Sequence, residues 1–152
     1  MTKVKKMVAD AARETCDGST AGLPRLKYRI ALILAEALSQ LPWVKEIYYA
    51  DLSSGEVVRG ADSDGTDIDL IVVAENPPPG IGVVTKHLEI ELNQALAEAL
   101  LSAGAELPGR IAAKHGLVEL HINDIYAKLV ARKTSGGGLS SLNAFRIWPP
   151  QQ

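Results

Sequence analysis

The order of apolar and polar positions along the chain predicts both helices and strands. Some segments repeat apolar residues every three or four positions, as an amphipathic helix does, and others alternate or run apolar between Gly, Pro and Ser residues, as strands do. In chain order these are a helix over 1–17, a helix over 26–41, strands over 44–52 and 67–74, a helix over 84–102, a strand over 117–122 and a helix over 125–133. This order predicts an α/β (α+β) fold, in which a small mixed sheet is flanked by helices.

Glycine and proline residues divide the chain into these elements. Residues 18–24 interrupt the helical pattern, so residues 1–22 are expected to form an N-terminal helix and a hinge. Three glycines at 136–138 predict a flexible C-terminal tail over 134–152, in which 144–148 either adds an edge strand or packs Trp148 on the core. A length of 152 residues predicts a single domain spanning 1–152.

The long helix over 84–102 is expected to bury one face and to expose the other. The residues expected to face inward are Leu88, Leu92, Ala95, Leu96, Ala99 and Leu100. The residues expected to face solvent are Lys86, Glu89, Asn93 and Glu98.

Composition and charge narrow the class of protein. With 47% hydrophobic and 22% charged residues, the chain has the composition of a globular protein. A formal net charge of −2 excludes non-specific binding to nucleic acids or acidic membranes through an overall basic field. Cys16 is the only cysteine, which excludes an intramolecular disulfide and a multi-cysteine metal cage. We therefore expect a cytoplasmic protein with no membrane association.

Two acidic residues at the start of the strand over 67–74 are the main candidates for chemistry. Because side chains alternate in a strand, Asp67 and Asp69 are expected on one face, with their Cα atoms about 6.6 Å apart. Such carboxylates repel each other unless a divalent cation bridges them. Oxygen-only ligands suit magnesium or manganese better than zinc. We therefore expect a magnesium or manganese site, against the alternative of two solvated aspartates.

A longer pattern spans residues 43–73 and carries a resemblance to a known family. Gly55 follows a predicted strand, Arg59-Gly60 comes a few residues later, and Asp67-Ile68-Asp69 opens the next strand. This arrangement resembles the minimal nucleotidyltransferases of the DNA polymerase beta superfamily. The resemblance implies a nucleotidyltransferase fold and a site in which two magnesium ions hold a nucleoside triphosphate (NTP). A hydroxyl then attacks the α-phosphorus and releases pyrophosphate.

The same resemblance assigns residues to the phosphates of the nucleotide. The residues expected to hold them are Ser53, Ser54, Gly55, Arg59 and Gly60, and the backbone amides near the two glycines could form an anion-binding nest. Glu56 departs from the pattern, because it stands where the family has a serine and would repel the phosphates. Either an upstream serine takes over this contact, or the site is weakened.

The family also uses a third acid on a later strand, which binds a metal ion and accepts the proton of the attacking hydroxyl. Glu119 matches this role best, because it lies near the start of the strand over 117–122 on its polar face. Asp51 and Asp124 are weaker substitutes at strand ends. His121 shares the face of Glu119, and we interpret it as an ordinary half-exposed histidine rather than as a ligand.

Together these patterns predict a metal-dependent nucleotidyltransferase that takes an NTP as substrate and magnesium or manganese as cofactor. The alternative is a catalytically weakened nucleotide- or partner-binding module on the same fold, and a third hypothesis is a structural interaction domain with surface acids. Because a chain of 152 residues leaves little room for acceptor recognition, a partner protein is expected to present the acceptor.

Overall fold

The fold was obtained as a computed structural model, which describes residues 2–15, 22–50, 68–104, 117–124, 126–128 and 144–150. In this part of the chain the elements are α1 (Thr2–Thr15), α2 (Gly22–Leu38), β1 (Val44–Ala50), β2 (Ile68–Ala74), α4 (Ile81–Ser102), β3 (Val118–Ile122) and β4 (Ala144–Trp148). Residues 126–128 add a short helical segment. The prediction of a mixed α/β fold with a small sheet and flanking helices is confirmed.

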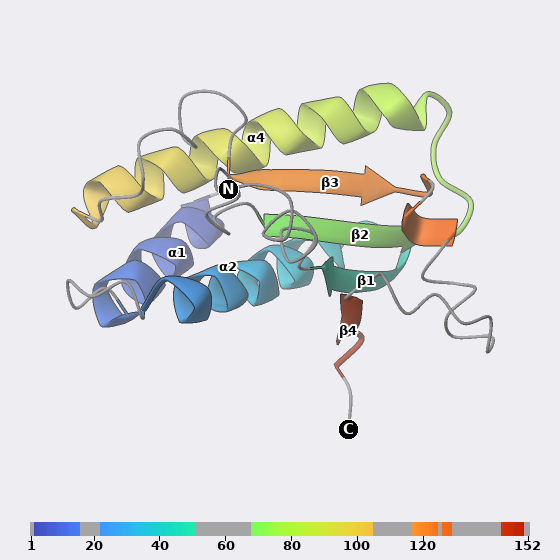
Figure 1. Cartoon of the computed structure of the whole chain (residues 1–152). Helices are drawn as coiled ribbons and strands as arrows, with labels where there is room; N and C mark the ends of the chain where they lie inside the picture. The colour runs from blue at the N-terminus through green and yellow to red at the C-terminus, as the bar shows by residue number, and fades with distance from the viewer. Residues whose placement is uncertain are drawn as a thin grey trace, which may run out of the picture.

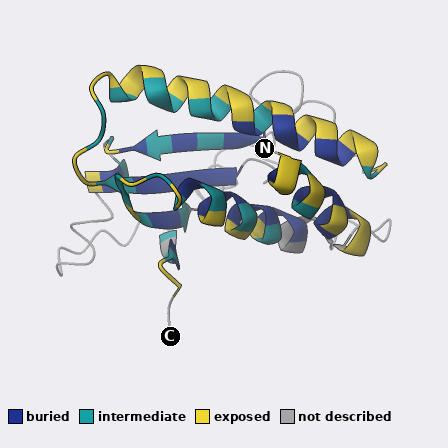
Figure 2. Cartoon of the chain, turned by 180° about the vertical axis from the view of Figure 1, so that it is seen from behind, coloured by how far each residue is buried: buried dark blue, intermediate teal, exposed yellow. Residues whose placement is uncertain are grey.

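The described strands form a four-stranded mixed sheet in the order β3-β2-β1-β4. β1 pairs antiparallel with both β2 and β4, whereas β2 and β3 are parallel. Parallel neighbours need a long crossover connection, and α4 lies in the connection between β2 and β3. Figures 1 and 2 show the chain from two opposite sides, with α1, α2 and α4 packed beside the sheet.

One hydrophobic core joins these helices to one face of the sheet. Alternation along β2 directs Ile68, Leu70 and Val72 into this core, together with buried residues of α1, α2 and α4. The opposite face of β2 carries Ile71, which packs with Tyr48 and the helical segment at 126–128 in a second, smaller cluster. Both faces of β2 are therefore covered in its middle, as its apolar sequence predicts.

α4 buries the face that the sequence predicts. Its buried residues are Leu92, Ala95, Leu96, Ala99 and Leu100. The helix begins at Ile81, three residues before the predicted start at 84, directly after Gly80 with its left-handed φ of 73°. Glycine adopts this conformation without steric cost. Within the described ranges, no helix combines the length and the hydrophobicity needed to cross a membrane.

Two helix boundaries differ from the prediction around α2. The predicted start of the helix at 26 is four residues late, because α2 already begins at Gly22. Pro24 is tolerated in the first turn, where its missing N–H would have no intrahelical partner. At the other end, α2 stops at Leu38 rather than at 41. Pro42 has no N–H to donate to the carbonyl of Leu38, and its ring would clash with that carbonyl, so the helix cannot continue through it.

The C-terminal segment belongs to the sheet. Residues 144–148 form β4, which pairs with β1, so the prediction of an edge strand is confirmed. Trp148 also packs, partly buried, against the main core. The flexible tail expected over 134–152 is therefore wrong for residues 144–148, whereas 134–143 lie outside the described residues.

Candidate functional site

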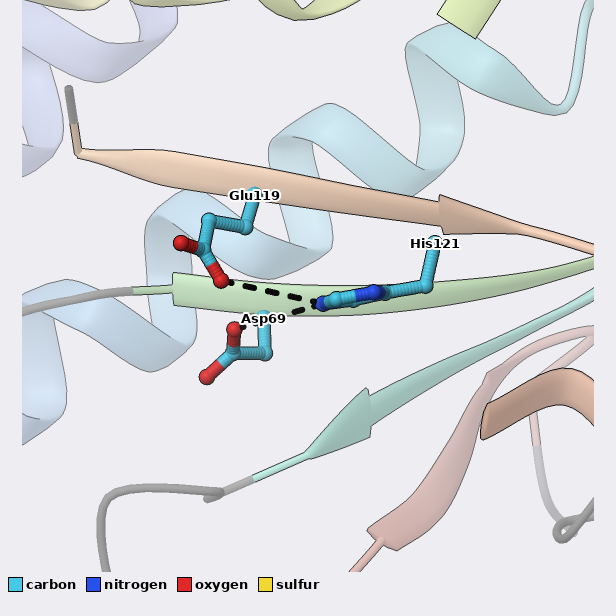
Figure 3. Close-up of side chains that lie close together, drawn as sticks. All are labelled: Asp69, Glu119 and His121. Carbon is cyan, nitrogen blue, oxygen red and sulfur yellow. Dashed lines mark ion pairs between the residues drawn. The ribbon is translucent and has the colours of Figure 1, made fainter. Parts of the chain in front are cut away.

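The parallel pairing of β2 and β3 brings together side chains that are far apart in the sequence. Asp69 on β2 is in register with Glu119 on β3, and Ile71 is in register with His121. Figure 3 shows Asp69, Glu119 and His121 projecting from the same face of the sheet, with α2 behind the strands on the other face. One ligand atom of each side chain lies within 4.8 Å of the others. We call these three residues the acid–histidine cluster.

The cluster is buried unevenly. The side chain of Asp69 is 5% exposed and that of His121 is 15% exposed, whereas Glu119 is 43% exposed. Nε2 of His121 lies 3.6 Å from Oδ1 of Asp69 and 3.8 Å from Oε2 of Glu119. Both distances are too long for a hydrogen bond, so among the described residues this buried nitrogen has no hydrogen-bond partner. Buried polar atoms seldom remain unsatisfied, which makes Nε2 a candidate donor atom for a ligand.

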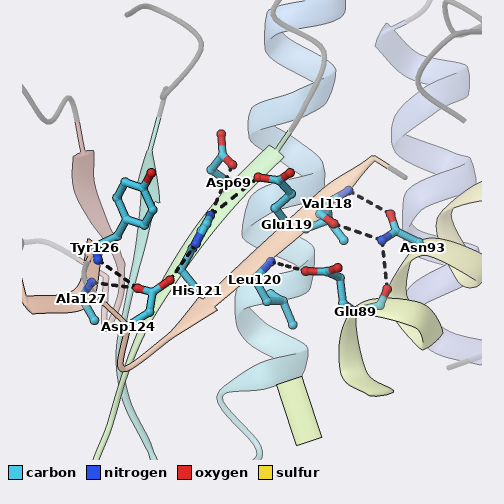
Figure 4. Close-up of polar contacts among 10 residues, drawn as sticks. All are labelled: Asp69, Glu89, Asn93, Val118, Glu119, Leu120, His121, Asp124, Tyr126 and Ala127. Carbon is cyan, nitrogen blue, oxygen red and sulfur yellow. Dashed lines mark hydrogen bonds and ion pairs between the residues drawn. The ribbon is translucent and has the colours of Figure 1, made fainter. Parts of the chain in front are cut away.

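The other ring nitrogen of His121 is held firmly. Nδ1 lies 2.8 Å from Oδ2 of Asp124. The second carboxylate oxygen of Asp124 accepts hydrogen bonds from the backbone N–H groups of Tyr126 (3.0 Å) and Ala127 (3.2 Å), as Figure 4 shows. Because an ionised carboxylate only accepts, Nδ1 carries the proton and donates to Asp124. In the neutral ring the lone pair is then on Nε2, which faces Asp69 and Glu119.

Charge in the cluster favours any cation placed there. Burial disfavours the protonated imidazole, but the carboxylates of Asp69 and Asp124 outweigh this effect and raise the pKa of His121 above its ordinary value. The buried Asp69 carboxylate needs a neutralising partner, because an isolated buried charge is costly. Either a protonated His121 or a bound dication can supply that positive charge.

Asp124 is expected to stabilise the segment after β3 as a helix cap. Replacing Asp124 by alanine removes the acceptor for two backbone N–H groups and is expected to lower the free energy of unfolding by about 1 kcal/mol. Asparagine keeps an acceptor oxygen, so Asp124→Asn should cost much less. Urea unfolding of both variants tests this, and equal losses would contradict a capping role.

The edge strand β3 is held in place by α4. Oδ1 of Asn93 accepts from the N–H groups of Leu117 (2.7 Å) and Val118 (2.9 Å), and its Nδ2 donates to the carbonyl of Val118 (3.0 Å). Oε2 of Glu89 accepts from the N–H of Leu120 (3.0 Å). These contacts are visible in Figure 4. The prediction that Asn93 and Glu89 face solvent is wrong, because both satisfy backbone groups on the side of β3 away from β2.

Removing the Asn93 side chain is expected to loosen β3. Asn93→Ala would leave polar backbone groups of Leu117 and Val118 without partners, at a cost of about 2 kcal/mol in the free energy of unfolding. Gln94→Ala is a matched control, because Gln94 is the exposed next residue of the same helix. Chemical unfolding should separate the two variants; a similar effect of both would contradict the bridging role of Asn93.

The predicted site residues fall into two groups. The structure brings Asp69 and Glu119 together and places Asp124 behind His121, away from the two carboxylates. The expected half-exposure of His121 is wrong, because its side chain is mostly buried, with Nε2 facing both acids. Strand alternation from Glu119 was the signal that could have included it. The predicted residues that lie outside the described part of the chain are Asp51, Ser53, Ser54, Gly55, Glu56, Arg59, Gly60 and Asp67.

Comparisons with protein-family models, with curated proteins and with solved structures found no match. The resemblance of residues 43–73 to nucleotidyltransferases therefore stays a prediction from the sequence. Function has to be argued from the acid–histidine cluster and from the elements that position it.

Proposed function

We propose that the chain is a divalent-cation-dependent nucleotidyltransferase, which moves a nucleoside monophosphate from an NTP to a hydroxyl acceptor and releases pyrophosphate. One observation carries the proposal. The buried carboxylate of Asp69 lies in register beside Glu119 of the neighbouring parallel strand, on the sheet face opposite α2. A pair of acids in this position suits a cation that must also reach a phosphate.

The order of elements supports the same proposal. β1 and β2 are antiparallel neighbours, and α4 crosses over to the parallel strand β3. Asp69 is the second residue of β2, so it lies near the start of this strand. The predicted phosphate-binding residues 53–60 come shortly before β2 in the sequence. Asp67, two residues earlier, remains the predicted second carboxylate of the Asp-x-Asp motif. We include the nucleotidyltransferase fold itself in the proposal.

The donor atoms of the cluster fit a divalent cation. Two carboxylates balance its charge, and the unsatisfied Nε2 offers a further lone pair. A bound dication would neutralise the negative charge that develops on the phosphates during transfer. Asp69 and Glu119 would hold it from two different strands.

Glu119 is the group that we assign to proton transfer. It is the most exposed member of the cluster, so a hydroxyl acceptor can reach its carboxylate. The acceptor oxygen forms a bond to the α-phosphorus, the bond to the bridging oxygen of pyrophosphate breaks, and the hydroxyl proton passes to Glu119. Glu119 therefore has two roles in the proposal, as ligand and as general base.

Nucleotide binding and turnover test the proposal separately. Calorimetry of the full chain with non-hydrolysable analogues of ATP, GTP, CTP and UTP should detect binding of at least one with Mn²⁺, and none with EDTA. A coupled pyrophosphate assay with the natural NTPs then measures turnover. Binding without pyrophosphate release would favour the weakened binding module that Glu56 suggests. No binding of any NTP would contradict both functions.

A further inference from the structure

We infer that His121 is a third protein ligand of the cation and that the site therefore prefers a transition-metal dication, such as manganese or zinc, to magnesium. The inference rests on the cation site of the proposed function but not on nucleotide turnover. It replaces the oxygen-only ligand set that the sequence predicts by a mixed set of two oxygens and one nitrogen.

The distances in the cluster are close to those of a coordination sphere. Metal–ligand bonds of about 2.1 Å place neighbouring ligand atoms about 3.0 Å apart in octahedral sites and about 3.4 Å apart in tetrahedral sites. Nε2 of His121 lies 3.6 Å from Asp69 and 3.8 Å from Glu119. These separations exceed the tetrahedral value by about 0.2–0.4 Å and the octahedral value by about 0.6–0.8 Å, and the three ligand atoms all lie within 4.8 Å of one another. Side-chain rotations would bring the three atoms around one ion, most readily in a tetrahedral arrangement.

The contacts of His121 match those of a metal-binding histidine. Such a histidine binds the ion through one ring nitrogen and donates the N–H of the other to a carboxylate, which fixes the orientation of the ring. Here Nδ1 lies 2.8 Å from Asp124, and Asp124 is itself fixed by the N–H groups of Tyr126 and Ala127. Nε2 is buried and faces the two acids, and it has no hydrogen-bond partner within the described part of the chain.

The nitrogen donor determines which ion the site prefers. Magnesium binds oxygen ligands almost exclusively and gives up its water reluctantly, whereas imidazole suits zinc and other transition-metal ions. Two carboxylates and a neutral imidazole also balance the charge of one dication. A site with this donor set should bind Mn²⁺ and Zn²⁺ more tightly than Mg²⁺, because magnesium gains little from the nitrogen donor. Zn²⁺ should bind more tightly than Mn²⁺, in agreement with the general order of transition-metal affinities.

Titration of the nucleotide-free chain with MgCl₂, MnCl₂ and ZnCl₂ tests the preference. We expect Mn²⁺ to bind at least about tenfold more tightly than Mg²⁺, and Zn²⁺ to bind more tightly still. His121→Ala should weaken Mn²⁺ and Zn²⁺ binding by about tenfold or more and change Mg²⁺ binding little. His87→Ala is the matched control, because His87 is an exposed histidine on α4.

Electron spin-echo measurements on the Mn²⁺-loaded protein test the ligand directly. The unmodified chain should show coupling of Mn²⁺ to an imidazole nitrogen, and this coupling should persist in His87→Ala and vanish in His121→Ala. The chain has three histidines, so coupling that persists in both His87→Ala and His115→Ala assigns the nitrogen to His121 even if His121→Ala does not fold. Nitrogen coupling without Mn²⁺-dependent binding of any NTP analogue would support the inference and count against the proposed function. Mn²⁺-dependent turnover without nitrogen coupling would overturn the inference and leave the proposed function standing.

Discussion

Asp69→Asn is expected to weaken divalent-cation binding by more than about a hundredfold, which exceeds the 10–100-fold effect typical of residues that only support a ligand. Asp69 is the most buried member of the acid–histidine cluster, and its carboxylate faces both His121 and the strand that carries Glu119. Asparagine has nearly the same shape but no charge, so the change removes an anionic ligand with little effect on packing. Nucleotide binding that depends on the metal should be lost as well.

Calorimetry with MnCl₂, alone and with a non-hydrolysable NTP, measures both effects of Asp69→Asn. Glu75→Gln is a suitable control, because Glu75 is an exposed acid that follows the other end of β2. It should bind the cation as the unmodified chain does. Unchanged Mn²⁺ affinity in Asp69→Asn, with a native circular dichroism spectrum, would contradict the cation site and with it the proposed enzymatic function.

Leu96→Ala is expected to lower the free energy of unfolding by about 3 kcal/mol, because truncating a buried leucine loses apolar burial and leaves a cavity. Leu96 is fully buried in the middle of α4 and belongs to the core that this helix shares with α1, α2 and the sheet. Leu101→Ala makes the same chemical change on the same helix at a side chain that is 83% exposed. The control should therefore change stability by less than about 0.5 kcal/mol.

Urea unfolding followed by circular dichroism can measure both leucine variants. A large difference in the midpoint between Leu96→Ala and Leu101→Ala would verify that α4 packs through the face assigned to it. Equal and small effects would show that α4 is not part of the main core, and the crossover from β2 to β3 would then need a different arrangement.

Local patterns predicted much of the fold and part of the candidate site. Apolar periodicity located α4 and its buried face, and alternation located β2 and β3 within one residue of their ends. The same alternation placed Glu119 on the half-exposed face of β3, where the structure has it. These features depend on the spacing of neighbours along the chain, which a single sequence displays directly.

Contacts across the fold could not be predicted in this way. The register that pairs Asp69 with Glu119 joins residues about fifty positions apart, and nothing local to either strand specifies it. Asn93 shows the same limit, because a polar residue on a helix has the same pattern whether it faces water or the backbone of an edge strand. The role of Asp124 depends on how the chain turns after β3, which its composition does not reveal.

The side chains that α4 places against β3 also restrict how the sheet can grow. A strand from another polypeptide can add to a sheet only where backbone N–H and carbonyl groups are available to it. At β3, Asn93 and Glu89 already bind several of those groups, so this side is closed to a further strand. Of the strands that the structure describes, β4 is then the edge beside which a peptide or second copy would extend the sheet, at the far side from the acid–histidine cluster.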